Sequence, residues 1–298
     1  MVAAVFGAGA IGAVIAESLH QYYGDTCFAV ADSQRAARYR NLTLNGKRTT
    51  FPWRSSSDPV TADLVIIAVK GYHLEGVIET IRPWTAEHTQ IISLLNGITS
   101  EQIIGRAFGR KDMLLSLAVG QDAVRRGSEV TYTRKGKILL GEASVPSASK
   151  RAEELKNMLV QGGVQCEIPC NMKKALWWKF MVNTGINQVS AVLDAPYKAF
   201  QQPGKPREMM LRSIEEVRMI AGFEGIALTD ADVAQWLDLL DTLSPEGETS
   251  MLQDVRARRK TEVDLFAGTL INLAEKHGAE VPFNRELYQK LGEEKKQS

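Results

Sequence analysis

The stretch that decides the fold is the N-terminal run Met1-Val-Ala-Ala-Val-Phe-Gly7-Ala-Gly9-Ala-Ile-Gly12, which an apolar segment at helical spacing continues over 13–19. Three glycines at this spacing, between a β-prone run and a helix, are typical of the turn that holds a dinucleotide pyrophosphate. Gly7 allows a tight turn, Gly9 lets phosphate approach bare backbone, and Gly12 lets helix and strand pack closely. The helix N-terminus adds N–H groups and a partial positive charge. The alternative is a tight β–α turn without a ligand.

An acidic residue follows at the distance that this motif predicts. Asp32 lies twenty residues after Gly12, at the end of a second apolar run. In dinucleotide-binding units an acid at this place hydrogen-bonds the ribose 2′-hydroxyl. We therefore expect a cofactor site made by Gly7, Ala8, Gly9, Ala10, Ile11, Gly12 and Asp32.

Composition and charge argue against several classes of function. The 298 residues carry a formal net charge of +1 and no basic stripe, so nothing attracts nucleic acid. No apolar stretch approaches the roughly 18 residues that span a bilayer, and the first residues lack the basic region of a signal peptide. We expect a cytoplasmic protein that binds neither nucleic acid nor a membrane.

Cysteine and histidine do not form a metal-binding pattern. The three cysteines, Cys27, Cys166 and Cys170, fit neither a disulfide framework nor a zinc ligand set, because their number is odd and their spacing is wrong. The four histidines are scattered, with no pair at metal-ligand spacing. We expect reduced thiols and no metal site.

The first half of the chain alternates short apolar runs with helical stretches, the pattern of a parallel α/β sheet. A hairpin of 129–134 and 137–140, joined at Lys135-Gly136, a helix over 148–161 and a strand over 164–168 are expected to close this unit. Pro169 marks the boundary, which gives domains 1–168 and 169–298. The strands expected before the hairpin are 2–6, 27–31, 64–69, 90–95 and 113–119.

The second half reads almost entirely as helix, which indicates a separate core. Breaks are expected at 203–206, at 244–247 and at Pro282. The helix over 249–276 would be unusually long, and would form either the spine of a domain core or part of a dimer interface. The expected helices are 173–187, 208–224, 229–243, 249–276 and 285–291.

Two segments of the helical half carry polar residues at helical spacing. Lys179, Asn183 and Asn187 recur every four positions in an otherwise apolar segment, which places them on one helix face. They form either a solvated stripe or a substrate-binding face, and two asparagines, which are poor helix formers, in an otherwise apolar segment favour the second. Asp254, Arg258 and Glu262 share a stripe of the expected long helix, which on its own indicates only ion pairs. A nucleotide-binding domain followed by helices is a recurrent layout of enzymes that transfer hydride.

Taken together, these segments resemble the ketopantoate reductase family, the 2-dehydropantoate 2-reductases. The resemblance implies an α/β Rossmann-type N-terminal domain followed by an all-α C-terminal domain of the 6-phosphogluconate dehydrogenase C-terminal-like kind. The lysine–asparagine–asparagine helix and the Ser-Met-Leu-Gln-Asp segment are more specific than the glycine motif. The matching stretches are Gly7–Gly12, Ala68-Val69-Lys70, Leu95-Asn96-Gly97, Trp178-Lys-Phe-Met-Val-Asn183 with Ile186-Asn187, and Ser250-Met-Leu-Gln-Asp-Val255 with Lys260-Thr-Glu262.

The resemblance also implies a role for each matching residue. Lys179 corresponds to the general acid that protonates the carbonyl oxygen of a 2-keto acid as hydride arrives at carbon, and Glu262 to the glutamate that holds the cofactor and steers the lysine. Asn183 and Asn187 correspond to groups that bind the substrate hydroxyl, and Ser250 to the one that binds its carboxylate. Two residues at strand ends, Lys70 and Asn96, would face the cofactor, or else are an exposed loop lysine and an Asn-Gly turn.

Two positions depart from the family pattern. The family commonly has an arginine after the second strand, for the 2′-phosphate of NADPH, where this chain has Asp32. The resemblance implies NADPH, whereas a carboxylate favours NADH; Ser33, Arg35 and Arg38 still offer contacts to a phosphate. The family often has a further substrate-binding asparagine where this chain has Tyr197.

The sequence therefore predicts an NAD(P)H-dependent reduction of 2-dehydropantoate to (R)-pantoate, with a small 2-keto acid as substrate and a homodimer as one possible assembly. A related activity is an NAD-dependent D-2-hydroxyacid dehydrogenase for branched or aromatic 2-keto acids, which Asp32 and Tyr197 favour. A dinucleotide-binding redox sensor is a third hypothesis. The complete set of polar residues around Lys179 argues against it, because a sensor needs no proton donor.

Overall fold

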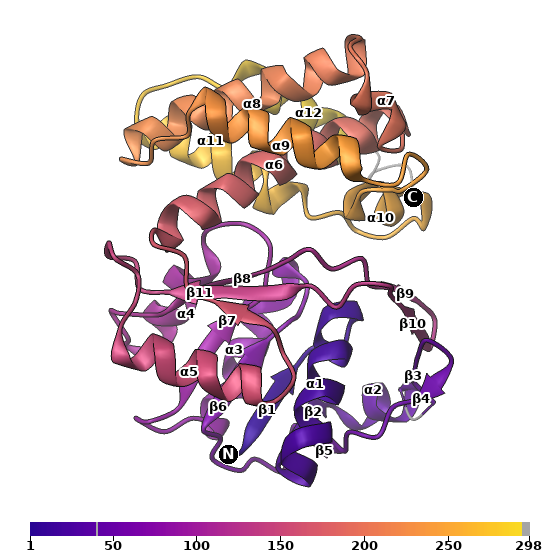
Figure 1. Ribbon diagram of the computed structural model, residues 1–298, viewed down its shortest axis with the longest axis vertical. Coiled ribbons are helices and arrows are strands. Elements are labelled where there is room, and N and C mark those ends of the chain that lie inside the picture. Colours follow the sequence, from indigo (N-terminus) through magenta and orange to yellow (C-terminus); the bar gives the residue numbers. More distant parts are fainter. Residues whose placement is uncertain (40, 294–298) are drawn as a thin grey trace. The chain divides into compact units, whose positions relative to one another are not determined.

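The computed structural model describes residues 1–39 and 41–293, which fall into two compact units, one up to Met172 and the other from Lys173 onwards (Figure 1). A five-stranded parallel sheet in the order β5-β2-β1-β6-β7 forms the centre of the first unit. Every residue of β1 and β6 is buried, which explains why these strands read as continuous apolar runs rather than as alternating patterns. The strands are β1 (Ala3–Phe6), β2 (Cys27–Ala31), β5 (Trp53–Ser55), β6 (Leu64–Ile67) and β7 (Gln90–Ser93).

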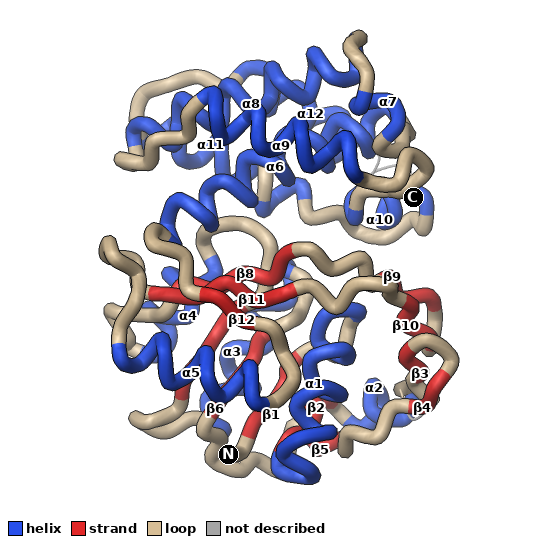
Figure 2. The backbone as a smooth tube through the Cα atoms, in the orientation of Figure 1, coloured by secondary structure: helices blue, strands red, loops and turns tan. Residues whose placement is uncertain are grey.

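Helices cover both faces of this sheet, as Figure 2 shows. Helix α1 (Ala10–Tyr23) packs its buried side against one face, where Ala3 and Val5 contribute to the core. The other face carries Phe6 and Trp84, whose rings meet edge to face with centroids 5.6 Å apart. A parallel sheet with both faces covered is the α/β Rossmann-type arrangement that the sequence predicts. The further helices of this unit are α2 (Ser33–Arg38), α3 (Leu74–Ile81), α4 (Ser100–Phe108) and α5 (Lys150–Gln161).

Two smaller sheets complete the first unit, and they correct the sequence analysis. The expected hairpin of 129–134 with 137–140 is wrong, because β10 (Glu129–Thr131) pairs with β9 (Val124–Arg126) and β11 (Lys137–Gly141) pairs with β8 (Leu115–Val119). The Asp122 carboxylate accepts hydrogen bonds from the backbone N–H groups of the two residues after Tyr132, at 2.9 and 2.8 Å, and so ends the first strand. Strand β8 lies in a three-stranded sheet with β11, and not in the five-stranded parallel sheet. The remaining strands are β3 (Thr43–Leu44), β4 (Lys47–Arg48) and β12 (Cys166–Glu167).

In its described part, the second unit contains helices and no strand. A buried glutamine ties several of these helices together: Gln188 Nε2 donates to Asn284 Oδ1 at 3.1 Å, and Ala267 N donates to Gln188 Oε1 at 3.2 Å. None of the described helices is long and apolar enough to cross a lipid bilayer. The helices are α6 (Met172–Leu193), α7 (Lys198–Gln201), α8 (Lys205–Phe223), α9 (Asp230–Thr242), α10 (Ser250–Arg256), α11 (Ala267–Lys276) and α12 (Pro282–Glu293).

The expected long helix over 249–276 is wrong. Helix α10 ends at Arg256, and Arg258 adopts the left-handed conformation with φ of 51°. The backbone N–H of Arg259 then returns to the carbonyl oxygen of Asp254 at 2.8 Å, which closes the helix. Asp254 and Glu262 therefore do not share a helical stripe. The expected break at Pro282 is the first residue of α12, where proline loses no helical hydrogen bond.

Candidate active site

In the first unit, the candidate residues lie around the turn between β1 and α1. A Cβ atom on Gly7, whose φ is 101°, would lie 2.6 Å from the carbonyl oxygen of Ala68. A Cβ atom on Gly12 would lie 2.0 Å from the carbonyl oxygen of Gly7. Both glycines are therefore needed by the fold itself, with or without a ligand.

Gly9 is different from its two neighbours in the motif. It has an ordinary extended conformation, with φ of −70° and ψ of −161°, and a Cβ atom there would meet nothing within 4 Å. Nothing in the fold requires glycine at this position. Helix α1 starts at Ala10 without a side-chain cap, so no capping side chain occupies its first backbone N–H groups. This arrangement suits a phosphate group, which needs bare backbone and N–H donors.

Asp32 follows β2 directly and forms the N-cap of α2. Its Oδ1 accepts a hydrogen bond from Arg35 N at 2.7 Å, and its Oδ2 lies 3.5 Å from Arg35 Nε. The carboxylate is exposed. Asp32 therefore has a local structural role that sequence reasoning did not consider, and this role leaves carboxylate lone pairs available to a ribose hydroxyl.

Lys70 and Asn96 lie at the same edge of the parallel sheet. Lys70 follows β6 and precedes the short 3₁₀ helix Gly71–His73, while Asn96 follows β7 and precedes Gly97, whose φ is 90°. The carboxyl ends of parallel strands meet at one edge, which is where the turn after β1 also lies. The structure thus brings both residues to the edge that carries the glycine turn.

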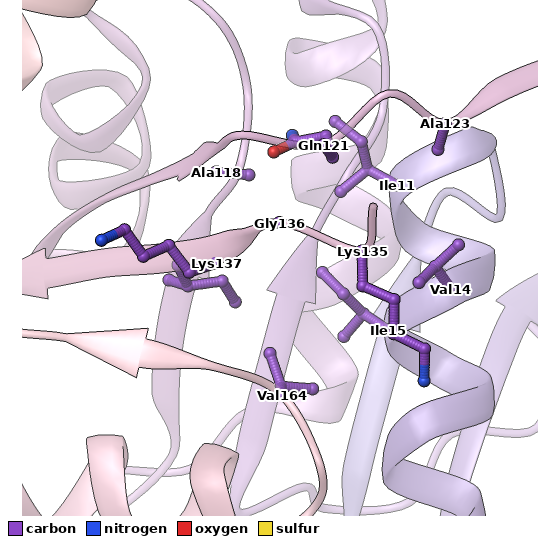
Figure 3. Close-up of a pocket in the computed structure, with 11 residues that line it drawn as sticks. Ile11, Val14, Ile15, Ala118, Gln121, Ala123, Lys135, Gly136, Lys137 and Val164 are labelled. Atoms are coloured by element: carbon purple, nitrogen blue, oxygen red, sulfur yellow. The ribbon is translucent and has the colours of Figure 1, made fainter. Parts of the chain in front are cut away.

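An apolar recess lies beside α1, between this helix and strands β8 and β11 (Figure 3). Ile11 and Val14 contribute to its wall, and Gln121 has a buried Oε1 atom without a hydrogen-bond partner. Lys135 is turned to Ser18, with Nζ 3.2 Å from its hydroxyl oxygen. Because the recess includes neither Gly9 nor Asp32, it is not the place where the motif would hold a nucleotide.

In the second unit, α6 is unbroken from Met172 to Leu193 and carries the polar stripe predicted from sequence. Residues four apart lie one above another on a helix, so Lys179, Asn183 and Asn187 share one side. Lys179 and Asn183 are half-buried and Asn187 is 5% exposed, whereas their neighbours Phe180 and Ile186 are buried core residues. The stripe is therefore not the fully solvated face of an amphipathic helix.

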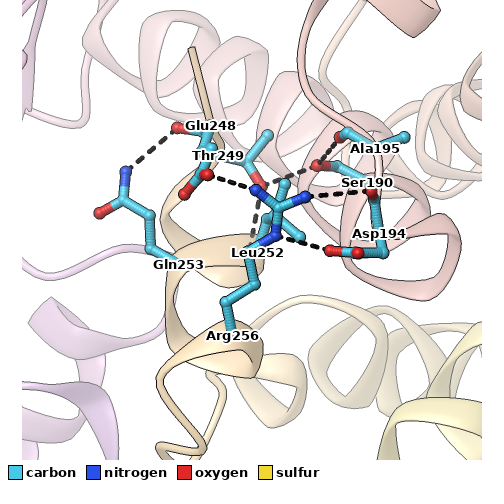
Figure 4. Close-up of polar contacts among 8 residues, drawn as sticks. All are labelled: Ser190, Asp194, Ala195, Glu248, Thr249, Leu252, Gln253 and Arg256. Carbon is cyan, nitrogen blue, oxygen red and sulfur yellow. Dashed lines mark hydrogen bonds and ion pairs between the residues drawn. The ribbon is translucent and has the colours of Figure 1, made fainter. Parts of the chain in front are cut away.

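The C-terminus of α6 is joined to the start of α10 by a chain of hydroxyl groups (Figure 4). Thr249 is the N-cap of α10, because its Oγ1 accepts a hydrogen bond from Leu252 N at 3.2 Å. The same hydroxyl donates to Ser190 Oγ at 3.1 Å, and Ser190 donates to the carbonyl oxygen of Ala195 at 2.7 Å. These contacts fix Ser250, the first residue of α10, with respect to α6.

An arginine clamp reinforces the same junction. Arg256 Nε lies 2.6 Å from Asp194 Oδ1, and its Nη1 pairs with the carboxylate of Glu248 (Figure 4). Hydrogen bonds to Asp194 and Glu248 raise the pKa of Arg256 above its usual value. The sequence offers Thr249 or Ser250 as the cap of this helix, and the structure shows Thr249 in that role. Ser190 and Arg256 were missed as parts of this arrangement.

Tyr197, which stands where the family often has asparagine, packs beneath the loop that leads to α10. Its N–H donates to the carbonyl oxygen of Gly247 at 3.0 Å, and a Cβ atom on Gly247 would lie 2.9 Å from the tyrosine ring. Burial raises the pKa of Tyr197. The ring is thus held two residues before Thr249, beside the segment that positions Ser250.

Glu262 lies outside any α-helix, at the start of the 3₁₀ turn Val263–Leu265, and it is 6% exposed. Its carbonyl oxygen accepts a hydrogen bond from Leu265 N at 2.9 Å. The hydrogen bond from Ala267 N to Gln188 Oε1 fixes the start of α11, just after this turn, against α6. Among residues 1–39 and 41–293, no cluster of histidine, cysteine and acidic side chains could hold a metal ion.

Comparison with known proteins assigns both units. Residues 3–144 match the model of the family described as Ketopantoate reductase PanE/ApbA, and residues 171–295 match the model of its C-terminal part. The chain belongs to the ketopantoate reductase family. It is a family of pyridine-nucleotide-dependent 2-keto acid reductases.

Several curated relatives and solved structures are similar over nearly their whole length. The 2-dehydropantoate 2-reductase of Archaeoglobus fulgidus is 25% identical, over 95% of this chain and 94% of the relative. A crystal structure of the Geobacter metallireducens 2-dehydropantoate 2-reductase has a TM-score of 0.85 at 27% identity and covers 98% of this chain and 99% of that one. A D-mandelate dehydrogenase with NADH and anilino(oxo)acetate has a TM-score of 0.86 at 22% identity, covers 100% and 99% of the two chains, and shares the fold.

Proposed function

We propose that this protein is a 2-dehydropantoate 2-reductase, which reduces the 2-keto group of 2-dehydropantoate to give (R)-pantoate. The observation that carries the proposal is the polar stripe of α6, where a lysine and two amides lie on one side of a helix whose other neighbours are core residues. The open space at Gly9 supports a nucleotide on the turn after β1. Membership of the family supports the reaction class.

The nucleotide would be held in the first unit. The N–H groups at the start of α1 suit its pyrophosphate, Asp32 suits a ribose hydroxyl, and Lys70 and Asn96 lie at the strand ends towards which the nicotinamide would extend. The bound nicotinamide supplies hydride to the carbonyl carbon of the substrate. We propose Glu262 as the residue of the second unit that also contacts the cofactor.

Lys179 is the proposed general acid. An ammonium group stabilises the negative charge that develops on the carbonyl oxygen, and the proton on its Nζ then completes the hydroxyl group of the product. Lysine becomes neutral in this step and recovers its proton from solvent. The amides of Asn183 and Asn187 are proposed to hold the substrate hydroxyl, and the hydroxyl of Ser250 its carboxylate. Glu262 is proposed to orient the lysine.

A second candidate activity is the NAD-dependent reduction of branched or aromatic 2-keto acids to D-2-hydroxy acids. The specific observation in its favour is Tyr197, whose ring occupies the position beside the α10 loop at which the family often has asparagine. The fold similarity to a D-mandelate dehydrogenase that binds NADH agrees with this activity. Asp32 also favours a cofactor without a 2′-phosphate.

Initial-rate assays with two substrates and two cofactors test these proposals. The loss of absorbance of the reduced nicotinamide is followed with 2-dehydropantoate or with 2-oxo-2-phenylacetate, the 2-keto acid that corresponds to mandelate. Each substrate is tested with NADPH and with NADH. A higher kcat/KM for 2-dehydropantoate supports the first activity, and a higher value for the aromatic acid supports the second. Absence of turnover with every pair would contradict both. Light scattering of the purified protein tests the proposed homodimer, which a dimeric ketopantoate reductase from Staphylococcus aureus of the same fold suggests.

A further inference from the structure

Arg125 connects the glycine turn to the end of α2. Its Nη1 donates a hydrogen bond to the carbonyl oxygen of Ala8 at 2.5 Å, and its Nε donates to that of Gly127 at 3.0 Å. The guanidinium lies over the ring of Tyr39, with Cζ 3.9 Å from the ring centroid. Tyr39 is the residue at which α2 ends. Contacts with both the glycine turn and the α2 terminus therefore hold the half-buried guanidinium in place.

This position is next to the place where an adenosine ribose would lie. Phe6 pairs with Val30 in the parallel register of β1 and β2, so Ala8 and Asp32, each two residues further on, leave the sheet from neighbouring strands. Neighbouring strands lie about 4.8 Å apart. A dinucleotide whose pyrophosphate sits on the glycine turn places its adenosine ribose towards the end of the second strand. A guanidinium bonded to Ala8 is therefore at the ribose end of the site.

The charges at this end do not exclude a phosphate group. The Asp32 carboxylate is engaged by Arg35, whose backbone N–H and Nε approach its two oxygens at 2.7 and 3.5 Å. Arg125 adds a second guanidinium, so the three side chains together carry one net positive charge. Among the described residues, Nη2 of Arg125 makes no hydrogen bond.

We propose that Arg125 binds the 2′-phosphate of NADPH, and that this chain therefore accepts NADPH although an acid occupies position 32. The inference rests on the proposed nucleotide site of the first unit. A guanidinium is always charged, is weakly hydrated and presents paired N–H donors that match phosphate oxygens. Stacking on Tyr39 fixes its plane before the ligand arrives, so little side-chain entropy is lost on binding. The competing explanation is that Arg125 only ties β9 to the glycine turn.

Calorimetric titration with NADP⁺ and NAD⁺ distinguishes these explanations, because the two nucleotides differ only in the 2′-phosphate. The full-length protein is compared with Arg125→Met and with Arg126→Met, which removes the exposed neighbouring arginine on β9. Loss of charged hydrogen bonds to the phosphate predicts that Arg125→Met binds NADP⁺ roughly 10- to 100-fold more weakly. Affinity for NAD⁺, and both affinities of Arg126→Met, should change by no more than about threefold, as expected for an exposed charge.

The outcomes separate this inference from the proposed function. Equal weakening of NADP⁺ and NAD⁺ binding by Arg125→Met would show a purely structural role, and unchanged NADP⁺ binding would show no role; either overturns the inference and leaves the nucleotide site standing. Wild-type protein that binds neither nucleotide would refute both proposals. Arg125→Lys keeps the charge and should retain part of the NADP⁺ preference, so a variant that loses it entirely while still binding NAD⁺ shows that the planar guanidinium is required.

Discussion

Two glycines of the motif, Gly12 and Gly9, should respond differently to the addition of one methyl group. In Gly12→Ala the new Cβ would lie 2.0 Å from the carbonyl oxygen of Gly7, which is about 1.4 Å closer than an ordinary contact. In Gly9→Ala the methyl group would meet no protein atom within 4 Å, and the backbone conformation is one that alanine adopts freely. The first change therefore disturbs the protein itself, whereas the second disturbs only a ligand on the turn.

The expected magnitudes follow from these distances. Forcing backbone apart at Gly12 is an overpacking defect, which costs about 1–3 kcal/mol of unfolding free energy or more. At Gly9 the entropy that alanine removes from the unfolded chain, about 0.4–1 kcal/mol, offsets the weaker capping by alanine, so stability should change little. A methyl group between phosphate and backbone would break one or more charged hydrogen bonds, worth about 1.5–3 kcal/mol each, and weaken nucleotide binding roughly 10- to 100-fold.

Denaturant unfolding and fluorescence titration with NADPH measure the two quantities separately. We expect Gly9→Ala to retain wild-type stability and lose nucleotide affinity, and Gly12→Ala to lose stability. Wild-type affinity in Gly9→Ala would show that no phosphate lies on the turn. Equal destabilisation by both substitutions would refute the steric distinction on which the argument depends.

Three further predictions concern other parts of the molecule. Lys179→Met should lower kcat by about 10²- to 10⁴-fold, as for loss of a general acid, with nearly unchanged Kd for NADPH. Lys173→Met removes an exposed lysine of the same helix and should change neither kcat nor Kd. Comparable losses of kcat in both variants would argue against Lys179 as the general acid. The hydrogen bond from Lys276 is the largest of the contacts that lower the pKa of Glu224 in the folded protein. The ionised Glu224 carboxylate therefore stabilises the fold fully above its unfolded pKa of 4.5, and this contribution is lost as the pH falls through the lower folded pKa. The unfolding free energies of Glu224→Gln and wild type should converge in acid, and a difference that stays constant with pH would contradict this expectation. Burial raises the pKa of the Cys27 thiol to about 11 and that of the Cys166 thiol to about 12, whereas Cys170 is exposed. Iodoacetamide should therefore modify only Cys170 in the native protein, and mass spectrometry that finds several labelled sites would contradict this expectation.

The sequence predicted four of the five strands of the parallel sheet, β1, β2, β6 and β7, because the burial of a strand leaves a local trace. It missed β5, a short strand in which no residue is fully buried. Strand β2 was predicted with its observed bounds, 27–31, since both faces are buried and the run is continuously apolar. The hairpin at Gly136 was predicted wrongly because the pairing partner of a short strand is a tertiary property. Asp122, eleven residues away in sequence, takes the backbone N–H of Thr133 that a ladder would need.

In the candidate site, too, local patterns could be predicted from sequence and tertiary contacts could not. The stripe of Lys179, Asn183 and Asn187 could be predicted because four-residue spacing on an unbroken helix is a local pattern. The end of the helix before Glu262 could not be predicted from sequence. Arginine is a good helix former, so nothing at Arg258 indicates the left-handed conformation that it adopts. Contacts such as Thr249 with Ser190, which are 59 residues apart, leave no local signal at all.

In the proposed reaction, hydride passes from a reduced nicotinamide to the keto carbon of a 2-keto acid bound by this protein. The most direct test is a turnover experiment with 2-dehydropantoate and NADPH or NADH carrying deuterium at both transferable positions of the nicotinamide ring, followed by mass spectrometry of the product. We expect a 2-hydroxy acid with one deuterium at the former keto carbon. Recovery of unchanged keto acid with both cofactors, or of a product without deuterium, would contradict it.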